Sequence, residues 1–291
     1  MKTALAVGCI CPSKISTASA ATGANAIIGV NLTSGTASAT TKLYYNTIYL
    51  NNTTSGAGFG SSGIFHTVNN TTTTAALDLR NNLIVNTSVQ NGAGLAVAYR
   101  RSGGAANNLS NYASTSNNND FYAGTPSASR LIYYDGVSSA QTITAYKNGV
   151  FTAGTIATRD SNSFSENPTF LSTTGLNANF LHVDPTVSTR IESGGANIAT
   201  FTDDFDGNTR AGNGGYVGTG TAPDVGADEY EGAQPDLTAP TISYSPLANT
   251  TSFAARTLTV TITDATGVPT SGTGLPVLYW KINAGSYTAA T

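Results

Sequence analysis

Short strand-forming segments recur along the first half of the chain at intervals of about 35 residues. Segment 44–51, with the sequence YYNTIYLN, aligns with segment 79–86, LRNNLIVN, at an offset of 35 residues. A shorter copy at 118–122 follows after a further 38 residues. The copies share an Asn, one spacer residue and a run of β-forming residues. Repeats of this kind are typical of folds in which one structural unit stacks on the next.

A second series of short apolar strands alternates with the first. These strands lie at residues 26–31, 63–66, 94–99 and 131–134. The connections are rich in Gly, Asn, Ser and Thr, which favour turns or strands over helices. The abundance of these residues excludes a helical bundle. Charged residues make up only 10% of the chain, which excludes a coiled coil.

The pattern predicts an all-β fold, a β-solenoid in which each coil contributes one strand to each of two or three parallel sheets. Asn suits the recurring turn because it adopts the left-handed conformation at low cost, and its amide can bond to the Asn of the next coil. A β-sandwich of the same strands is the alternative. Turns in a sandwich recur about every 8–12 residues, however, without a sequence repeat at about 35 residues.

The regular repeats end at about residue 152, and we expect an irregular cap from there to residue 232, since terminal repeats of solenoids are atypical. A linker is expected at 233–238. Residues 257–263 then alternate between Thr and apolar side chains, as a half-buried strand does. Together with a second strand at 277–282, this pattern predicts a truncated Ig-like β-sandwich over residues 239–291.

Two pairs of segments carry a resemblance to a known family: 203–210 with 222–229, and 236–242 with 275–282. The first pair is similar to the motif that closes many right-handed parallel β-helices, and the second resembles a bacterial Ig-like module. The stretch 14–232 as a whole resembles the passenger region of large secreted surface proteins of Bacteroidetes-type bacteria. The resemblance implies a right-handed parallel β-helix, export, residence outside the cell or on the bacterial surface, and a larger parent polypeptide.

Residues 1–13 do not match this family. Lys2 and the apolar run 4–11 imitate a secretory signal, and a start inside a longer protein explains them equally well. Cys9 and Cys11 are poorly placed to form a disulfide with each other, and no second ligand pair follows to complete a zinc site.

The charge and hydropathy patterns bear on the partners. The net charge is −3, and Arg100–Arg101 is the only adjacent basic pair, so nucleic acid is not an expected partner. No stretch approaches the roughly 18 apolar residues of a membrane-spanning helix. We expect a secreted or cell-surface structural or adhesive module that contacts an extracellular glycan or the cell-surface matrix, without catalysis.

Aromatic rings are the candidate glycan-binding groups, because they can stack on sugar rings. The candidates in the predicted coils are Tyr44, Tyr45, Tyr49, Tyr133 and Tyr134. Adjacent tyrosines point to opposite faces of a strand, so about half of them are expected in the interior.

The alternative function is a polysaccharide lyase or a glycoside hydrolase. Lyases on parallel β-helices use acidic calcium ligands on one sheet and an Arg or Lys as base. The weak candidates for these roles are Asp120, Asp135, Arg130 and Lys147. The two histidines, His66 and His182, stand in no motif of a catalytic base.

Asp203, Asp204 and Asp206 form a cluster that could bind Ca²⁺, the one cofactor that the sequence suggests. The loop matches only the middle of an EF-hand, because Thr202 and Asn213 occupy its end positions. The favoured alternative is a turn in which these carboxylates accept backbone N–H bonds and pair with Arg210.

Overall fold

The computed structural model describes residues 22–33, 40–69, 76–103, 110–149, 159–272 and 274–290. The chain divides into two compact units, Met1–Gln234 and Pro235–Thr291. Both are built from strands, and within the described residues there is one helix, α1 (Ile143–Gly149). The prediction of an all-β chain is therefore confirmed. The expectations for residues 1–13, including both cysteines, lie outside the described residues.

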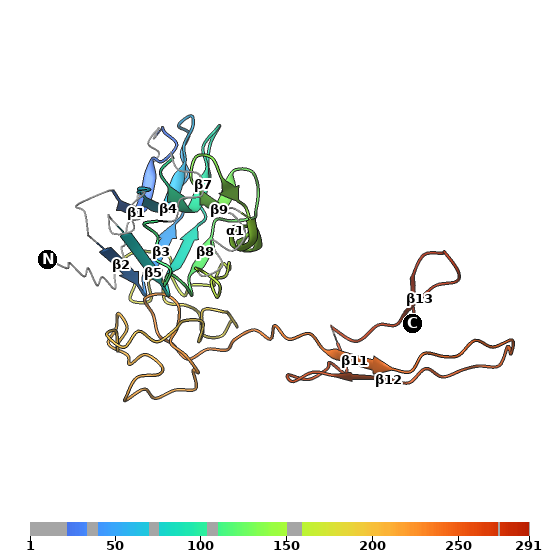
Figure 1. Cartoon of the computed structure of the whole chain (residues 1–291). Helices are drawn as coiled ribbons and strands as arrows, with labels where there is room; N and C mark the ends of the chain where they lie inside the picture. Colours follow the sequence, from blue (N-terminus) through green and yellow to red (C-terminus); the bar gives the residue numbers. More distant parts are fainter. Residues whose placement is uncertain are drawn as a thin grey trace. The chain divides into compact units, whose positions relative to one another are not determined.

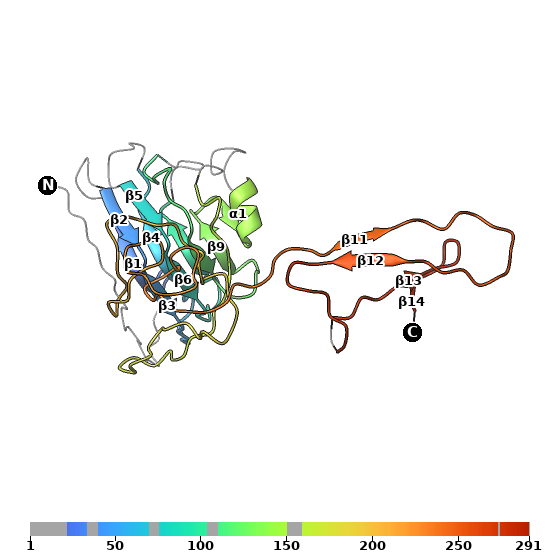
Figure 2. The same ribbon diagram turned by 90° about the horizontal axis from the view of Figure 1, so that it is seen from below.

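Three sheets of mainly parallel strands make up the first unit (Figures 1 and 2). The first sheet has the order β1 (Ile27–Leu32), β4 (Ser61–His66), β7 (Ala96–Arg101), β9 (Arg130–Tyr134), β10 (Ser139–Ala140), and only β10 is antiparallel to its neighbour. The second sheet pairs β2 (Thr40–Tyr44) with β5 (Ala76–Arg80). The third has the order β3 (Thr47–Leu50), β6 (Leu83–Asn86), β8 (Asp120–Tyr122).

The parallel pairs in these sheets join strands that are one repeat apart in the sequence. Ile27 in β1 lies opposite Ser61 in β4, 34 residues further along the chain. Leu83 in β6 lies opposite Asp120 in β8, 37 residues further. The strands predicted from the second sequence series all belong to the first sheet, so the repeat is the spacing between hydrogen-bonded neighbours.

The predicted register of the first series is wrong by one residue. The sequence alignment placed Asn46 against Asn81, whereas β3 pairs with β6 so that Thr47 lies opposite Leu83. Asn46 therefore faces Asn82, 36 residues later, and its backbone and side-chain N–H groups both donate to Asn82 Oδ1, at 3.1 and 2.8 Å. Two adjacent asparagines made both alignments reasonable, and the backbone decides between them.

These asparagines form a buried ladder across three coils. Asn82 donates its backbone and side-chain N–H groups to Asn119 Oδ1, at 3.0 and 2.9 Å. The Asn119 amide donates in turn to Asp160 Oδ1 at 3.1 Å, where the ladder ends. The residue before each ladder position is left-handed, with φ of 54° at Tyr45 and 55° at both Asn81 and Asn118. The ladder thus stabilises the turn that joins the second sheet to the third.

Both faces of the third sheet are buried. Its inward side chains, such as Ile84 and Phe121, join the core between the sheets. Leu83 and Val85 point the other way, into a second apolar cluster. That cluster is completed by Phe164, Val183, Ile191 and Val225. The third sheet is therefore enclosed between two cores.

The segment 165–234 supplies Val183, Ile191 and Val225 to that cluster and is called the irregular layer below. It was expected as a cap on the last repeat, and in the structure it contacts three successive repeats. The N–H of Ala227 donates to Thr47 Oγ1 at 2.9 Å, and the N–H of Gly226 donates to the Asn81 carbonyl at 2.8 Å. Asn118 Nδ2 donates to the Gly194 carbonyl at 3.0 Å. The layer consequently depends on the turns that the ladder holds.

The second unit contains two small antiparallel sheets. One pairs β11 (Thr241–Tyr244) with β12 (Val260–Thr263), and the other pairs β13 (Tyr279–Trp280) with β14 (Thr288–Ala289). None of its described residues is buried. The alternating segment predicted at 257–263 contributes its last four residues to β12.

The ladder predicts a specific loss of stability in the variant Asn82→Ala. The Asn46 amide would lose its acceptor, and the Leu43 carbonyl would lose the donor that now lies at 2.9 Å. Unsatisfied buried groups cost roughly 1–3 kcal/mol each, so we expect the free energy of unfolding to fall by about 2–4 kcal/mol in urea titrations. Asn179→Ala, at an exposed position, is the matched control. Equal losses in both variants would contradict a special role for the ladder.

Candidate functional site

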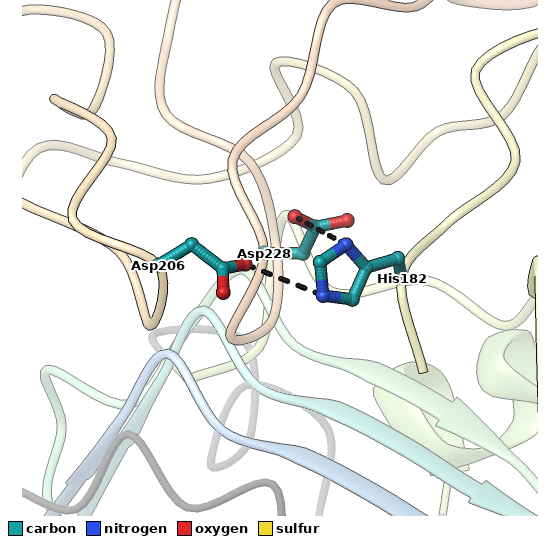
Figure 3. A group of neighbouring side chains, drawn as sticks. All are labelled: His182, Asp206 and Asp228. Atoms are coloured by element: carbon teal, nitrogen blue, oxygen red, sulfur yellow. Dashed lines mark ion pairs between the residues drawn. The ribbon is translucent and has the colours of Figure 1, made fainter. Parts of the chain in front are cut away.

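Three loops of the irregular layer bring one histidine and two aspartates together. His182 Nε2 lies 3.3 Å from Asp206 Oδ2, and His182 Nδ1 lies 3.9 Å from Asp228 Oδ1 (Figure 3). Each ring nitrogen of His182 faces a different carboxylate. Asp228 is buried, His182 is half-buried and Asp206 is exposed. The group, called the His–Asp triad below, therefore opens to solvent on one side.

Backbone groups hold the two carboxylates in place. Asp228 Oδ2 accepts the N–H of Val183 at 3.0 Å, which ties the residue after His182 to the Asp228 loop. The N–H of Asp206 donates to Asp204 Oδ1 at 2.9 Å, and Asp204 Oδ2 accepts the N–H of Glu229 at 3.0 Å. Asp204 thereby links the Asp206 turn to the Asp228 segment.

Burial is the main influence on the Asp228 carboxyl. Burial raises the pKa of Asp228, the His182 imidazole acts against this rise, and the nearby Asp204 and Asp206 add to it. One potential ligand atom from each member of the triad lies within 4.8 Å of the others. The triad could therefore hold a metal ion.

Of the three predicted metal ligands, the structure brings only Asp206 into this group. Asp203 forms a bridge with Thr209, and its carbonyl accepts a bond from Arg210 Nε at 3.2 Å. The Asp204 carboxylate accepts backbone N–H groups, as expected for the alternative in which these aspartates form a turn. Arg210 does not pair with these carboxylates and reaches Glu229 instead, at 3.2 Å.

Sequence reasoning missed His182 and Asp228 as members of a site. Asp228 belongs to the segment 222–229 that resembles the closing motif, and His182 lies 24 residues before Asp206. A signal was present in the acidic character of that motif together with the scarcity of histidine. Their proximity follows from the path of the irregular layer, which no repeat in the sequence encodes.

Each of the four lyase candidates is hydrogen-bonded to groups outside the set. Asp120 is fully buried and accepts the N–H of Glu166 at 2.7 Å, and burial raises its pKa well above the ordinary value. Asp135 accepts the N–H groups of Val137 and Ser138, at 2.9 and 2.6 Å.

Both basic candidates donate to backbone carbonyls. Arg130 reaches the Ala123 carbonyl at 3.4 Å, and Lys147 reaches the Ser161 carbonyl at 2.8 Å. No hydrogen bond or ion pair between any two of the four candidates is found among the described residues.

Protein groups contact the rings of the candidate tyrosines. Tyr44, Tyr45 and Tyr133 are buried. Tyr49 packs edge-on against Phe170, with ring centroids 5.6 Å apart. The Tyr134 ring faces the Arg100 guanidinium at 5.2 Å. Tyr44, Tyr45 and Tyr133 are therefore inaccessible to a sugar ring.

A second cluster of acids lies buried around Arg210. Its guanidinium contacts Glu229 and stands 4.0 Å from the centroid of the Tyr45 ring. Glu229 also accepts the N–H of Asp224 at 2.9 Å, and Asp224 accepts the N–H of Ser193 at 2.6 Å. Burial and, next, the Glu229 carboxylate raise the pKa of Asp224 to about 9. The segments that resemble the closing motif thus hold their fold through buried carboxylates.

No protein-family model matches the chain, and the comparisons with curated proteins and with solved structures give no match either. What this chain does is therefore inferred from its own residues and contacts. In the described residues there is no helix both long and apolar enough to cross a membrane.

The raised pKa of Asp224 predicts that stability falls as the pH rises. The folded state keeps a proton that the unfolded state releases near pH 4, so the stabilisation linked to this proton is lost between about pH 4 and about pH 9. In Asp224→Asn this slope of the unfolding free energy against pH should decrease by up to about 1.4 kcal/mol per pH unit.

Urea titrations at about pH 5, 6.5 and 8 measure this slope in both proteins. The slope is the decisive quantity, because the variant also alters the acceptor of the Ser193 and Tyr230 N–H groups and shifts the stability at every pH. An unchanged slope in the variant would contradict a protonated Asp224 in the folded state.

Proposed function

We propose that the first unit is a right-handed parallel β-helix that acts as a rigid structural or adhesive module of a secreted or cell-surface protein. The observation that carries this proposal is the parallel pairing of strands one repeat apart in three sheets. Two further observations support it: paired strands are 34 to 37 residues apart in the sequence, and Asn46, Asn82 and Asn119 form a ladder. Stacked coils of this kind make a stiff rod, because every coil is hydrogen-bonded to its neighbours.

The second unit is proposed to be an Ig-like module. Ile242 of β11 lies opposite Ile262 of β12, and Tyr244 lies opposite Val260, which gives the sheet an apolar side. Leu258 and Val277 line a groove beside the same side chains. Such an apolar side is the half of a sandwich that packs on a second sheet.

An extracellular glycan or the cell-surface matrix is the proposed partner. The chain carries few charges, and neutral hydroxyl and amide groups are suited to bonding with sugar hydroxyls. A polysaccharide lyase is not proposed, because Asp120 is enclosed and Asp135 is engaged in its own turn. The proposed role is passive presentation of a polar surface.

A polysaccharide screen of the full chain tests this role. We expect no depolymerisation of acidic or neutral polysaccharides, measured as new reducing ends and as unsaturated products, with or without divalent cations. A glycan array run on the same protein identifies binding that occurs without turnover. Asp120→Asn and Arg130→Gln are the comparison variants. Turnover that disappears in either variant would replace the adhesive module with the lyase alternative.

A further inference from the structure

We propose that the His–Asp triad binds one divalent transition-metal ion of the Zn²⁺ class, and that this ion cross-links the three loops that supply its ligands. One nitrogen of His182 and one oxygen each of Asp206 and Asp228 are the protein ligands. The open side of the triad leaves room for water to complete the coordination. Such a site goes beyond the proposed structural or adhesive role.

The separations of the ligand atoms fit a small cation. In a tetrahedral site with bonds of about 2.1 Å, neighbouring ligand atoms lie about 3.4 Å apart. The 3.3 Å contact to Asp206 is made by Nε2 of His182, and the 3.9 Å contact to Asp228 is made by Nδ1. With one nitrogen as ligand, the three ligand atoms all lie within 4.8 Å of one another. Closing that separation takes side-chain shifts on the order of 1 Å.

The donor set distinguishes between classes of metal. Ca²⁺ takes about six to eight ligands and binds oxygen alone, whereas imidazole nitrogen suits Zn²⁺ and its neighbours in the transition series. A site with one imidazole and two carboxylates on short loops matches Zn²⁺, Co²⁺ or Mn²⁺. The sequence-based expectation of Ca²⁺ at Asp203, Asp204 and Asp206 concerned a different set of ligands.

The groups that surround the ligands are arranged as in known metal sites, where hydrogen bonds from neighbouring groups orient the ligands. The Val183 N–H binds Asp228 Oδ2, which leaves Oδ1 directed at His182. Asp204 binds the Asp206 N–H and adds a third carboxylate nearby. Two carboxylates contact the one imidazole and the third lies close by, while Arg210 is paired with Glu229. A divalent cation would balance this excess of negative charge.

The position of the triad gives the ion a structural effect. Its ligands come from the loop that follows Phe180, from the turn around Asp204 and from the segment 222–230. These loops lack the regular ladder of the coils, and they cover the apolar cluster of the third sheet. A metal bound only in the folded state stabilises that state by linkage, so the irregular layer is the part that should respond.

The test uses the full chain, without an affinity tag, in the background Cys9→Ser and Cys11→Ser, since free thiols bind Zn²⁺ themselves. Chelator-treated protein is titrated with Zn²⁺ in a calorimeter, and with Co²⁺ while its visible absorption is recorded. We expect one equivalent of either ion to bind, Co²⁺ to give a d–d spectrum, and Zn²⁺ to raise the melting temperature by several degrees. Ca²⁺ should leave the melting temperature unchanged.

Variants assign the ligands. Asp206→Asn changes an exposed side chain and should weaken Zn²⁺ binding at least tenfold while the metal-free protein keeps its melting temperature. His182→Gln should abolish the Co²⁺ spectrum. Asp184→Asn, which changes a half-buried aspartate two residues from His182, is the matched control and should bind as the parent does.

Three results would overturn the proposal. The first is the absence of saturable binding at one equivalent in the parent protein. The second is equal binding by the parent and by Asp206→Asn and His182→Gln. The third is a melting-temperature rise with Ca²⁺ that matches the rise with Zn²⁺, which would assign the triad to hard cations. None of these results bears on the parallel β-helix or on glycan binding.

Discussion

The ladder of buried asparagine amides is the interaction on which the rest of the first unit depends. Asn82 and Asn119 each follow a left-handed residue, and the side-chain oxygen of each accepts two N–H groups from the repeat before it. The Asn82 Nδ2 atom also donates to the Leu43 carbonyl. Side chains therefore satisfy backbone groups at the turn between the second and third sheets, where strand pairing does not. With the corner fixed, the second and third sheets meet at a set angle, and the apolar side chains of each coil stack on those of the next.

The irregular layer extends this dependence to the outside of the molecule. The left-handed corner directs the Asn81 carbonyl and side chain outward, where they bond to Gly226 and Ala196. Gly226 itself has a φ of 102°, and a Cβ there would lie 2.8 Å from Thr47 Oγ1. The close approach of this loop to the sheet therefore requires glycine. The fold of the layer, the buried acids around Arg210 and the His–Asp triad all follow from this docking.

The sequence was sufficient to predict the parallel strands of the first and third sheets, because alternating apolar residues and turn residues are local signals, but it did not single out β2 and β5. It was also sufficient to predict the recurring Asn, since the left-handed turn favours that residue. The register at Asn81 and Asn82 was not predictable, because a shift by one residue still places an Asn opposite Asn46. The His–Asp triad was missed for a different reason. Its members lie on three loops whose meeting depends on how the layer docks, and docking is determined by contacts between distant segments.

The contacts of the irregular layer with Thr47, Asn81 and Asn118 have a consequence for how such a chain can change its length. These three residues belong to successive coils, and the layer binds all of them. An additional coil inserted between them would displace one anchor by about 4.8 Å, the spacing of neighbouring strands, and the loop would no longer reach it. A coil added before β1 would leave every anchor in place. The layer therefore fixes the number of repeats that it contacts, and a repeat can be added without disturbing these contacts only outside the part that the layer spans.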